Sequence, residues 1–171
     1  GGVKVSVIDT LVFDRTPEDL ARWEYLHQKE YAAMTAEERI EWDGAALHGS
    51  YNAGDLNRVG NAIVYLRDRL RNYGYSVNVT PKTDWAITDT PTVAQLKKYL
   101  ADVSAIRGAG GELSSLPEIP VRIYPSAAGK SDGLRIEKAN DIERMLSQLD
   151  SAITKMLSSW WGCGEIGCGE L

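Results

Sequence analysis

The chain has 171 residues, 43% of them hydrophobic and 25% charged, with a formal net charge of −5. This composition is typical of a globular domain with a real core, and it excludes disorder as the dominant state. The acidic balance and the lack of a basic stripe argue against nucleic acid as a partner. No apolar run reaches the ~18 residues of a transmembrane helix, so we expect no membrane partner.

The first elements expected are an extended arm and a helix. Residues 3–8 alternate apolar and polar side chains, which is typical of a short β-strand. Thr16 then suits a helix N-cap and Asp19 completes a capping box with it, which predicts a helix over about residues 17–32. We assign residues 1–15 to an N-terminal arm that pairs with a neighbour or joins an upstream module.

Two further helices are expected in the next part of the chain. A second capping box at Thr35 opens a short helix that should end near Gly44. The strongest helix follows over about residues 53–73. Its apolar residues step by three and four positions, which is the seam of a coiled coil. They are Leu56, Val59, Ile63, Leu66, Leu70 and Tyr73.

The middle of the chain predicts a strand, a helix and a loop. Residues 75–80 alternate apolar and polar again, which predicts a mid-chain β-arm that pairs with the first arm. Thr90 and Pro91 have the pattern of an N-cap and a first helical position, so a helix should begin there. Residues 108–133 are rich in Gly and Pro without a helical period, which predicts a long loop.

The last helix expected covers residues 135–160, where apolar residues step by four and three again. Three such seams predict a mainly α fold, an antiparallel helical bundle over residues 16–160 with the two short β-arms. Residues 161–171 are expected to form an extended Gly-rich C-terminal tail.

This tail repeats GCGEI as GCGEL directly after a tryptophan pair. Four glycines in ten residues make a backbone that is costly to order. We therefore expect the tail to dock on a partner subunit by strand addition, and the narrow seams to favour a homo-oligomer. The predicted partner-binding residues are Trp160, Trp161, Glu165, Ile166, Glu170 and Leu171.

Few residues in the chain could carry metal or thiol chemistry. Cys163 and Cys168 are the only cysteines, which is too few for a disulfide framework. A local bridge, a free pair and an intermolecular bridge all remain open. The only histidines are His27 and His48, so a chain-borne zinc site is not expected, and no metal or other cofactor is predicted.

Three other patterns raise questions of chemistry. His48 lies close to Ser50, but sequence neighbours rarely form a nucleophile–base pair. Asp84 and Asp89 flank a tryptophan in a loop, which is the most cleft-like pair of acids for a cell-wall hydrolase. Five tryptophans and eight tyrosines favour interfaces or sugar stacking. The candidate glycan-binding residues are Trp42 and Trp85.

Several strings of the sequence also match a known kind of protein. In chain order they are AMTAEERIEW (33–42), YNAGDLNRV (51–59), KTDW (82–85) and EKANDIE (137–143). With the aromatic and doubled Gly-Glu ending, the chain resembles small structural proteins and tail-protein domains of prophages from Gram-positive, largely gut, bacteria. The resemblance covers roughly residues 10–171.

This resemblance implies a virion component of the tail, baseplate or fibre, made in the bacterial cytoplasm. Its partners would be other virion proteins, and a fibre would be commonly a trimer. No catalytic residue is implied, and the relatives carry Tyr and Ser around the positions of Cys163 and Cys168. We therefore expect a non-enzymatic virion structural protein that acts in assembly or attachment. The rival interpretations are a carbohydrate-binding adhesin and a cell-wall hydrolase.

Polar residues in two of these strings are expected to hold helices in register rather than to do chemistry. Leu56 lies on the seam, whereas Asp55 and Arg58 face elsewhere. Asp55 can cap the helix start, and Arg58 can bridge to a carboxylate of another helix. We expect the same structural role for residues 140–143.

Overall fold

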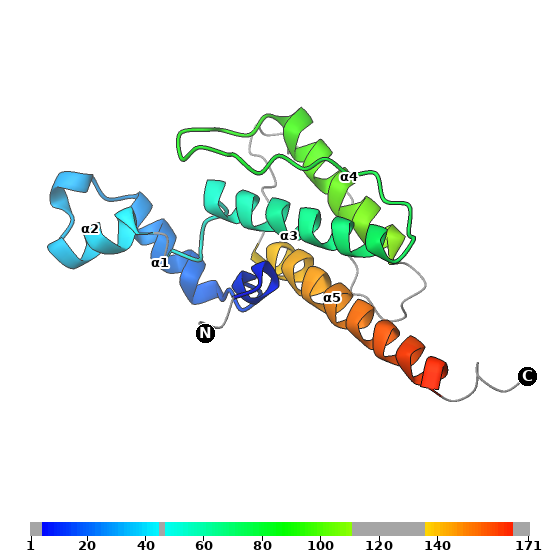
Figure 1. The fold of residues 1–171 in the computed structure, drawn as a ribbon. Coiled ribbons are helices and arrows are strands. Elements are labelled where there is room, and N and C mark those ends of the chain that lie inside the picture. Colours follow the sequence, from blue (N-terminus) through cyan, green and yellow to red (C-terminus); the bar gives the residue numbers. More distant parts are fainter. Residues whose placement is uncertain (1–4, 45–46, 111–135, 166–171) are drawn as a thin grey trace, which may run out of the picture.

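This computed structural model describes residues 5–44, 47–110 and 136–165, and in these ranges the chain is mainly helical (Figure 1). The mainly helical fold predicted from the sequence is confirmed. None of the described helices is both long and apolar enough to cross a lipid bilayer. The elements are η1 (Val7–Thr10), α1 (Pro17–His27), η2 (Tyr31–Ala33), α2 (Ala36–Asp43), α3 (Ala53–Asn72), α4 (Val93–Ala109) and α5 (Ile136–Glu165).

The core is formed by α3, α4 and α5, with η1 packed against α3 and α5. The predicted seams of these helices face one another, except that Tyr73 follows α3 and is exposed. Burying these seams supplies the apolar surface that stabilises the fold. Fully buried seam residues include Val59, Ile63, Leu66, Val103, Ile142, Leu146, Leu149 and Ile153.

Helices α3 and α5 lie side by side and run in the same direction (Figure 1). Arg58 pairs with Glu143, and further along both helices Arg69 pairs with Asp150. The prediction of an antiparallel bundle is therefore wrong for this pair. A short loop after a helix places the next helix antiparallel to it. The connection after α3 is long, and residues 73–92 return the chain to the end of the core at which α3 begins before α4 starts.

Helices α1 and α2 form a hairpin that projects from this core (Figure 1). Leu26 and Met34 are buried within the hairpin and do not belong to the main core. Arg22 of α1 pairs with Glu41 of α2 at 2.7 Å, and Lys29, just after α1, pairs with Glu38 of α2 at 2.8 Å. The hairpin therefore has its own small set of contacts outside the main core.

The two predicted β-arms are wrong, because the described residues contain no strand. In the first arm, residues 1–4 lie outside the described residues and Val7–Thr10 form a 3-10 turn. The Ser6 hydroxyl accepts a hydrogen bond from the Ile8 N–H, and the Asp9 carboxylate accepts one from the Ser6 N–H. This local capping box competes successfully with strand pairing.

Residues 75–80 lie along the core helices instead of pairing with a strand. The predicted alternation is present, since Val77 and Val79 are buried and their neighbours are exposed. Arg71 Nε donates to the Val77 carbonyl at 2.8 Å, and Arg67 donates to the Val79 carbonyl at 3.1 Å. Arginine side chains of α3 therefore satisfy carbonyl groups that a β-ladder would otherwise have satisfied.

Capping boxes mark the helix starts well. Those at Thr16 and Thr35 are confirmed, but α1 ends at His27 rather than near residue 32. Helix α4 begins at Val93 with Thr92 as its N-cap, so the predicted start at Thr90 is two residues too early.

Helix α5 continues to Glu165, beyond the end predicted at Trp160. The tail predicted to be extended from residue 161 is thus helical in its first part. Extending a formed helix requires no new nucleation, which offsets the roughly 1 kcal/mol cost of each glycine. Residues 166–171 lie outside the described residues, as do residues 111–135 of the predicted long loop.

Candidate functional site

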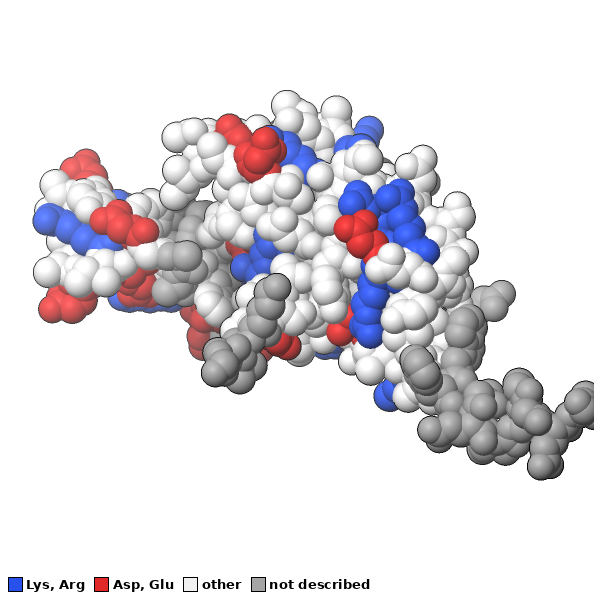
Figure 2. All heavy atoms as spheres, in the orientation of Figure 1, with Lys and Arg blue, Asp and Glu red and all other residues white. Residues whose placement is uncertain are grey.

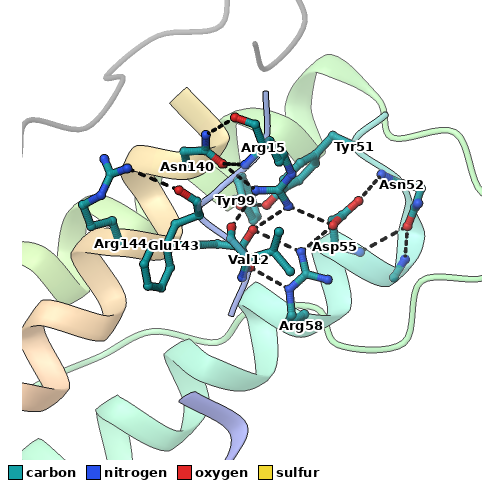
Figure 3. A network of polar contacts seen from close by, with 12 residues as sticks. Val12, Arg15, Tyr51, Asn52, Asp55, Arg58, Tyr99, Asn140, Glu143 and Arg144 are labelled. Atoms are coloured by element: carbon teal, nitrogen blue, oxygen red, sulfur yellow. Dashed lines mark hydrogen bonds and ion pairs between the residues drawn. The ribbon is translucent and has the colours of Figure 1, made fainter. Parts of the chain in front are cut away.

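A network of buried charges joins the root of the hairpin to the core (Figure 3). At its centre is Arg15, whose side chain is only 2% exposed. Its guanidinium donates to Glu143 Oε2 at 2.6 Å, to Asp55 Oδ1 at 3.0 Å and to the Val12 carbonyl at 2.7 Å. The residue that begins the hairpin is thus tied to both α3 and α5.

Side chains of α5 also bind the backbone of the segment before α1. Asn140 accepts from the Arg15 N–H at 3.1 Å and donates to the Arg15 carbonyl at 2.9 Å. Glu143 Oε1 accepts from the Val12 N–H at 3.0 Å. These bonds confirm the expectation that residues 140–143 hold parts of the fold in register.

Arg58 completes the network from α3. Its Nε donates to Glu143 Oε1 at 2.6 Å, and its second amino group bonds to Asp55. The predicted bridge from Arg58 to a carboxylate of another helix is therefore confirmed. Desolvation lowers the pKa of Arg58, but the hydrogen bonds and charges of Glu143 and Asp55 outweigh it and raise that pKa above its ordinary value.

The N-cap of α3 is Asn52, and the part that Asp55 was expected to play at the helix start is to complete a capping box with it. Asn52 Oδ1 accepts from the N–H groups of Gly54 and Asp55, and Asp55 Oδ2 accepts from the Asn52 N–H at 2.9 Å. One carboxylate thus stabilises a helix start and a buried cation together. With two arginines and two carboxylates, the network is balanced in charge, which buried ions require.

Two tyrosines lie against this network. The hydroxyl groups of Tyr51 and Tyr99 are 2.5 Å apart, and the Arg15 guanidinium lies 5.5 Å from the centre of the Tyr51 ring. Burial raises the pKa of both tyrosines, so neither hydroxyl ionises near neutral pH. The arrangement is suited to holding α4 against the root of the hairpin rather than to proton transfer.

Beside the network lies a groove of about 470 Å³, between the hairpin and the loop before α4. Trp23 of α1 and Trp42 of α2 line one side, and Trp85 and Ile87 of the loop line the other. In Figure 1 this loop extends toward the hairpin. The two predicted glycan-binding residues, Trp42 and Trp85, are thus brought to one hollow, together with a tryptophan that the sequence analysis did not assign to it.

An aromatic stack forms the hairpin side of the groove. The His27 ring lies 4.6 Å from the Trp23 ring and 6.1 Å from the Trp42 ring, and both pairs are stacked. His27 therefore packs between two indoles. The stack fixes the orientation of both tryptophans.

The opposite side of the groove is held to α3 by Asn57. Its side chain donates to the Trp85 carbonyl at 2.9 Å and accepts from the Trp85 N–H at 2.8 Å. The loop can approach because position 60 is glycine: a Cβ there would lie 2.7 Å from the Lys82 carbonyl oxygen. Lys82 Nζ in turn lies 5.1 Å from the Trp85 ring centre.

The other candidate chemical groups do not form a site. His48 is exposed and makes no hydrogen bond to Ser50 among the described contacts. The Asp84 side chain is 84% exposed and pairs with Lys82 at 2.5 Å, a hydrogen bond that lowers the pKa of Asp84. Asp89 accepts from the Ala86 N–H within the loop. The described residues contain no group of His, Cys, Asp and Glu arranged to hold a metal.

The predicted partner-binding residues lie at or beyond the far end of α5. The helix α5 includes Trp160, Trp161, Cys163 and Glu165. The rest lie outside the described residues: Ile166, Glu170 and Leu171, with Cys168.

Comparisons with known proteins add no family to this picture. No protein-family model matches the chain, and neither does any curated protein or solved structure. The prophage resemblance therefore rests on the sequence strings alone.

Proposed function

We propose that this protein is a non-enzymatic bacteriophage structural protein of the tail, baseplate or fibre that acts in particle assembly or attachment. One observation supports it above others. Three of the four strings that carry the prophage resemblance meet at the root of the hairpin, where Arg58 pairs with both Asp55 and Glu143, and Asn57 holds Trp85. These residues build a joint between parts of the fold, which supports a structural role.

The outer surface of the hairpin is suited to contact with a neighbour. Ile40 is 74% exposed, and Tyr25 and Tyr31 are also exposed. Figure 2 shows acidic and basic side chains intermixed on this part of the molecule. An exposed set of apolar and aromatic groups among charges is typical of a protein–protein contact.

The far end of α5 would provide a second contact. In Figure 1 the hairpin and the end of α5 lie at opposite ends of the molecule. A protein with contact surfaces at both ends can link two neighbours in a particle. Docking of the C-terminal tail and self-association, with a trimer as one arrangement, belong to the same proposal.

A cell-wall hydrolase has less support. A general acid needs a raised pKa in a sheltered site, whereas Asp84 is exposed, ion-paired and has a lowered pKa. We expect Asp84→Asn to leave the protein's behaviour on a host peptidoglycan zymogram unchanged. Clearing of the gel by the parent protein that is lost in this variant would favour the hydrolase instead.

Genetic deletion tests the assembly role. Removing the gene from the lysogen should leave induced lysates without intact particles in electron micrographs, and the parent gene supplied in trans should restore them. Ile40→Asp should fold, because this side chain is exposed, but restore fewer particles. Normal, infectious particles from the deletion strain would contradict the proposal.

A further inference from the structure

The groove at the root of the hairpin has the features of a ligand site. Its three indoles come from separate parts of the chain, since α1 supplies Trp23, α2 supplies Trp42 and the loop supplies Trp85. A volume of about 470 Å³ lies within the range of small-molecule sites, roughly 300–1,000 Å³. Both walls are fixed, one by the aromatic stack on His27 and the other by Asn57.

Polar groups lie beside these aromatic rings. Asp43, Ser50 and Asn52 line the same groove, and the described residues of its lining include no lysine or arginine. Tyr31 donates to Asp43 Oδ2 at 2.7 Å, and Asn52 Oδ1 is occupied by the start of α3. Among the described contacts, the amide nitrogen of Asn52 donates no hydrogen bond. A carboxylate without a compensating cation in the lining disfavours phosphate and other anions.

We propose that this groove binds a neutral pyranose unit of a glycan. A pyranose has an apolar face of C–H groups that packs on an indole and an edge of hydroxyl groups that donate and accept hydrogen bonds. The groove offers both kinds of surface: the half-buried Trp42 for the ring face, beside the small exposed part of Trp85, and Asp43 with Asn52 for the hydroxyls. This proposal does not depend on the protein's presence in a virion.

Binding there would also act on the hairpin. The two walls of the groove belong to the hairpin and to the loop that is held on α3, so one ligand would contact both. A ligand that binds across such a joint stabilises the joined arrangement. Amide hydrogen exchange in α1 and α2 should therefore slow when the groove is occupied.

Tryptophan fluorescence of the full chain tests the proposal. The probes are glucose, galactose, N-acetylglucosamine, cellobiose, lactose and chitobiose. At least one should give a saturable change with a Kd on the order of 1 mM. Trp42→Ala should weaken it about tenfold. Tyr25→Ala, which alters an exposed hairpin ring outside the groove lining, should leave it unchanged.

A second variant keeps the test independent of folding. Ile87 is 92% exposed at the edge of the groove, so Ile87→Glu should fold normally and still weaken binding. A flat response to every probe would overturn the proposal, as would saturable binding that both variants leave intact. Saturation by tetramethylammonium but by no sugar, or self-association abolished by Ile87→Glu, would assign the groove to a cation or to a second copy.

Discussion

The guanidinium of Arg15 lies 2.6 Å from the carboxylate of Glu143, although 128 positions separate the two residues. Arg15 begins the hairpin and Glu143 lies within α5, so one contact joins the N-terminal and C-terminal parts of the fold. The Glu143 side chain is fully buried and also accepts from Arg58. The attachment of the hairpin to the core therefore depends on this carboxylate.

Glu143→Gln should destabilise the protein strongly. It leaves Arg15 and Arg58 buried with one carboxylate between them, and removing one partner of a buried ion pair costs about 3–5 kcal/mol. Asp141→Asn is the matched control on the same helix, because its pair with Arg144 is exposed and should contribute about 0–1 kcal/mol. Urea unfolding measures both, and equal free energies of unfolding would show that the network is not important for stability.

The two tyrosine hydroxyls should show strong coupling. In Tyr51→Phe or Tyr99→Phe the remaining hydroxyl stays buried without its partner, which costs roughly 1–3 kcal/mol. The double variant removes both groups and should be destabilised by less than the sum of the single variants. A double-mutant cycle from chemical denaturation measures this coupling. Additive effects would mean that the two hydroxyls do not depend on each other.

Stability of the hairpin should depend on pH through Glu38. Its hydrogen bond with Lys29, then that with the Thr35 N–H, lowers the pKa of Glu38 from 4.5 to about 2. Because the folded pKa is depressed, the stabilisation is complete above about pH 4.5 and is lost as pH falls toward 2. NMR titration of the Glu38 carboxyl carbon measures its pKa, and the signal of the buried Met34 methyl group reports the stability of the hairpin over the same pH range.

Glu38→Gln provides the control for this titration. The variant should have a less stable hairpin at neutral pH, and its Met34 signal should no longer follow a titration between pH 4.5 and 2. A Glu38 carboxyl that titrates near 4.5 in the parent protein would contradict the assigned pairing.

Replacing two glycines of the core helices by alanine should change the stability of the protein in opposite directions. A Cβ at Gly60 would lie 2.7 Å from the Lys82 carbonyl oxygen, whereas at Gly108 it would meet nothing within 4 Å. Gly108→Ala should raise stability by about 0.5–1 kcal/mol, but Gly60→Ala should lower it and shift the fluorescence of Trp85. Thermal unfolding distinguishes the two, and equal stabilisation would show that the loop does not need this close approach.

Removing residues 166–171 should separate folding from assembly. The core seams end before this segment, so circular dichroism should show unchanged helix content per molecule. Incorporation of the truncated chain into particles should fall, because the predicted anchors Ile166 and Leu171 are lost. If the truncated protein unfolds, the segment supports the fold and the docking interpretation is wrong.

Local signals in the sequence were the most reliable guides to the structure. Capping boxes at Thr16 and Thr35 and the heptad seams depend on short-range geometry, and they are present as expected. The ion pair of Arg58 was also predictable, because an arginine beside the apolar seam of a packed helix needs a carboxylate partner. Its partner on α5 could not be named from spacing.

Features set by distant contacts were not predictable. The alternation in residues 75–80 is real, but only the fold shows that arginines of α3 replace a neighbouring strand. The parallel direction of α3 and α5 depends on the long connections between them. The spacing of apolar residues in each helix does not indicate this direction. The position of Trp23 in the groove follows from the hairpin's projection from the core, which its spacing along α1 does not reveal.

The central claim, a structural role in a phage particle, is tested most directly by quantitative mass spectrometry of gradient-purified particles induced from the source bacterium. The account predicts this chain at a stoichiometric level relative to known tail proteins. Absence from intact particles, with the protein abundant in the same lysate, would contradict it.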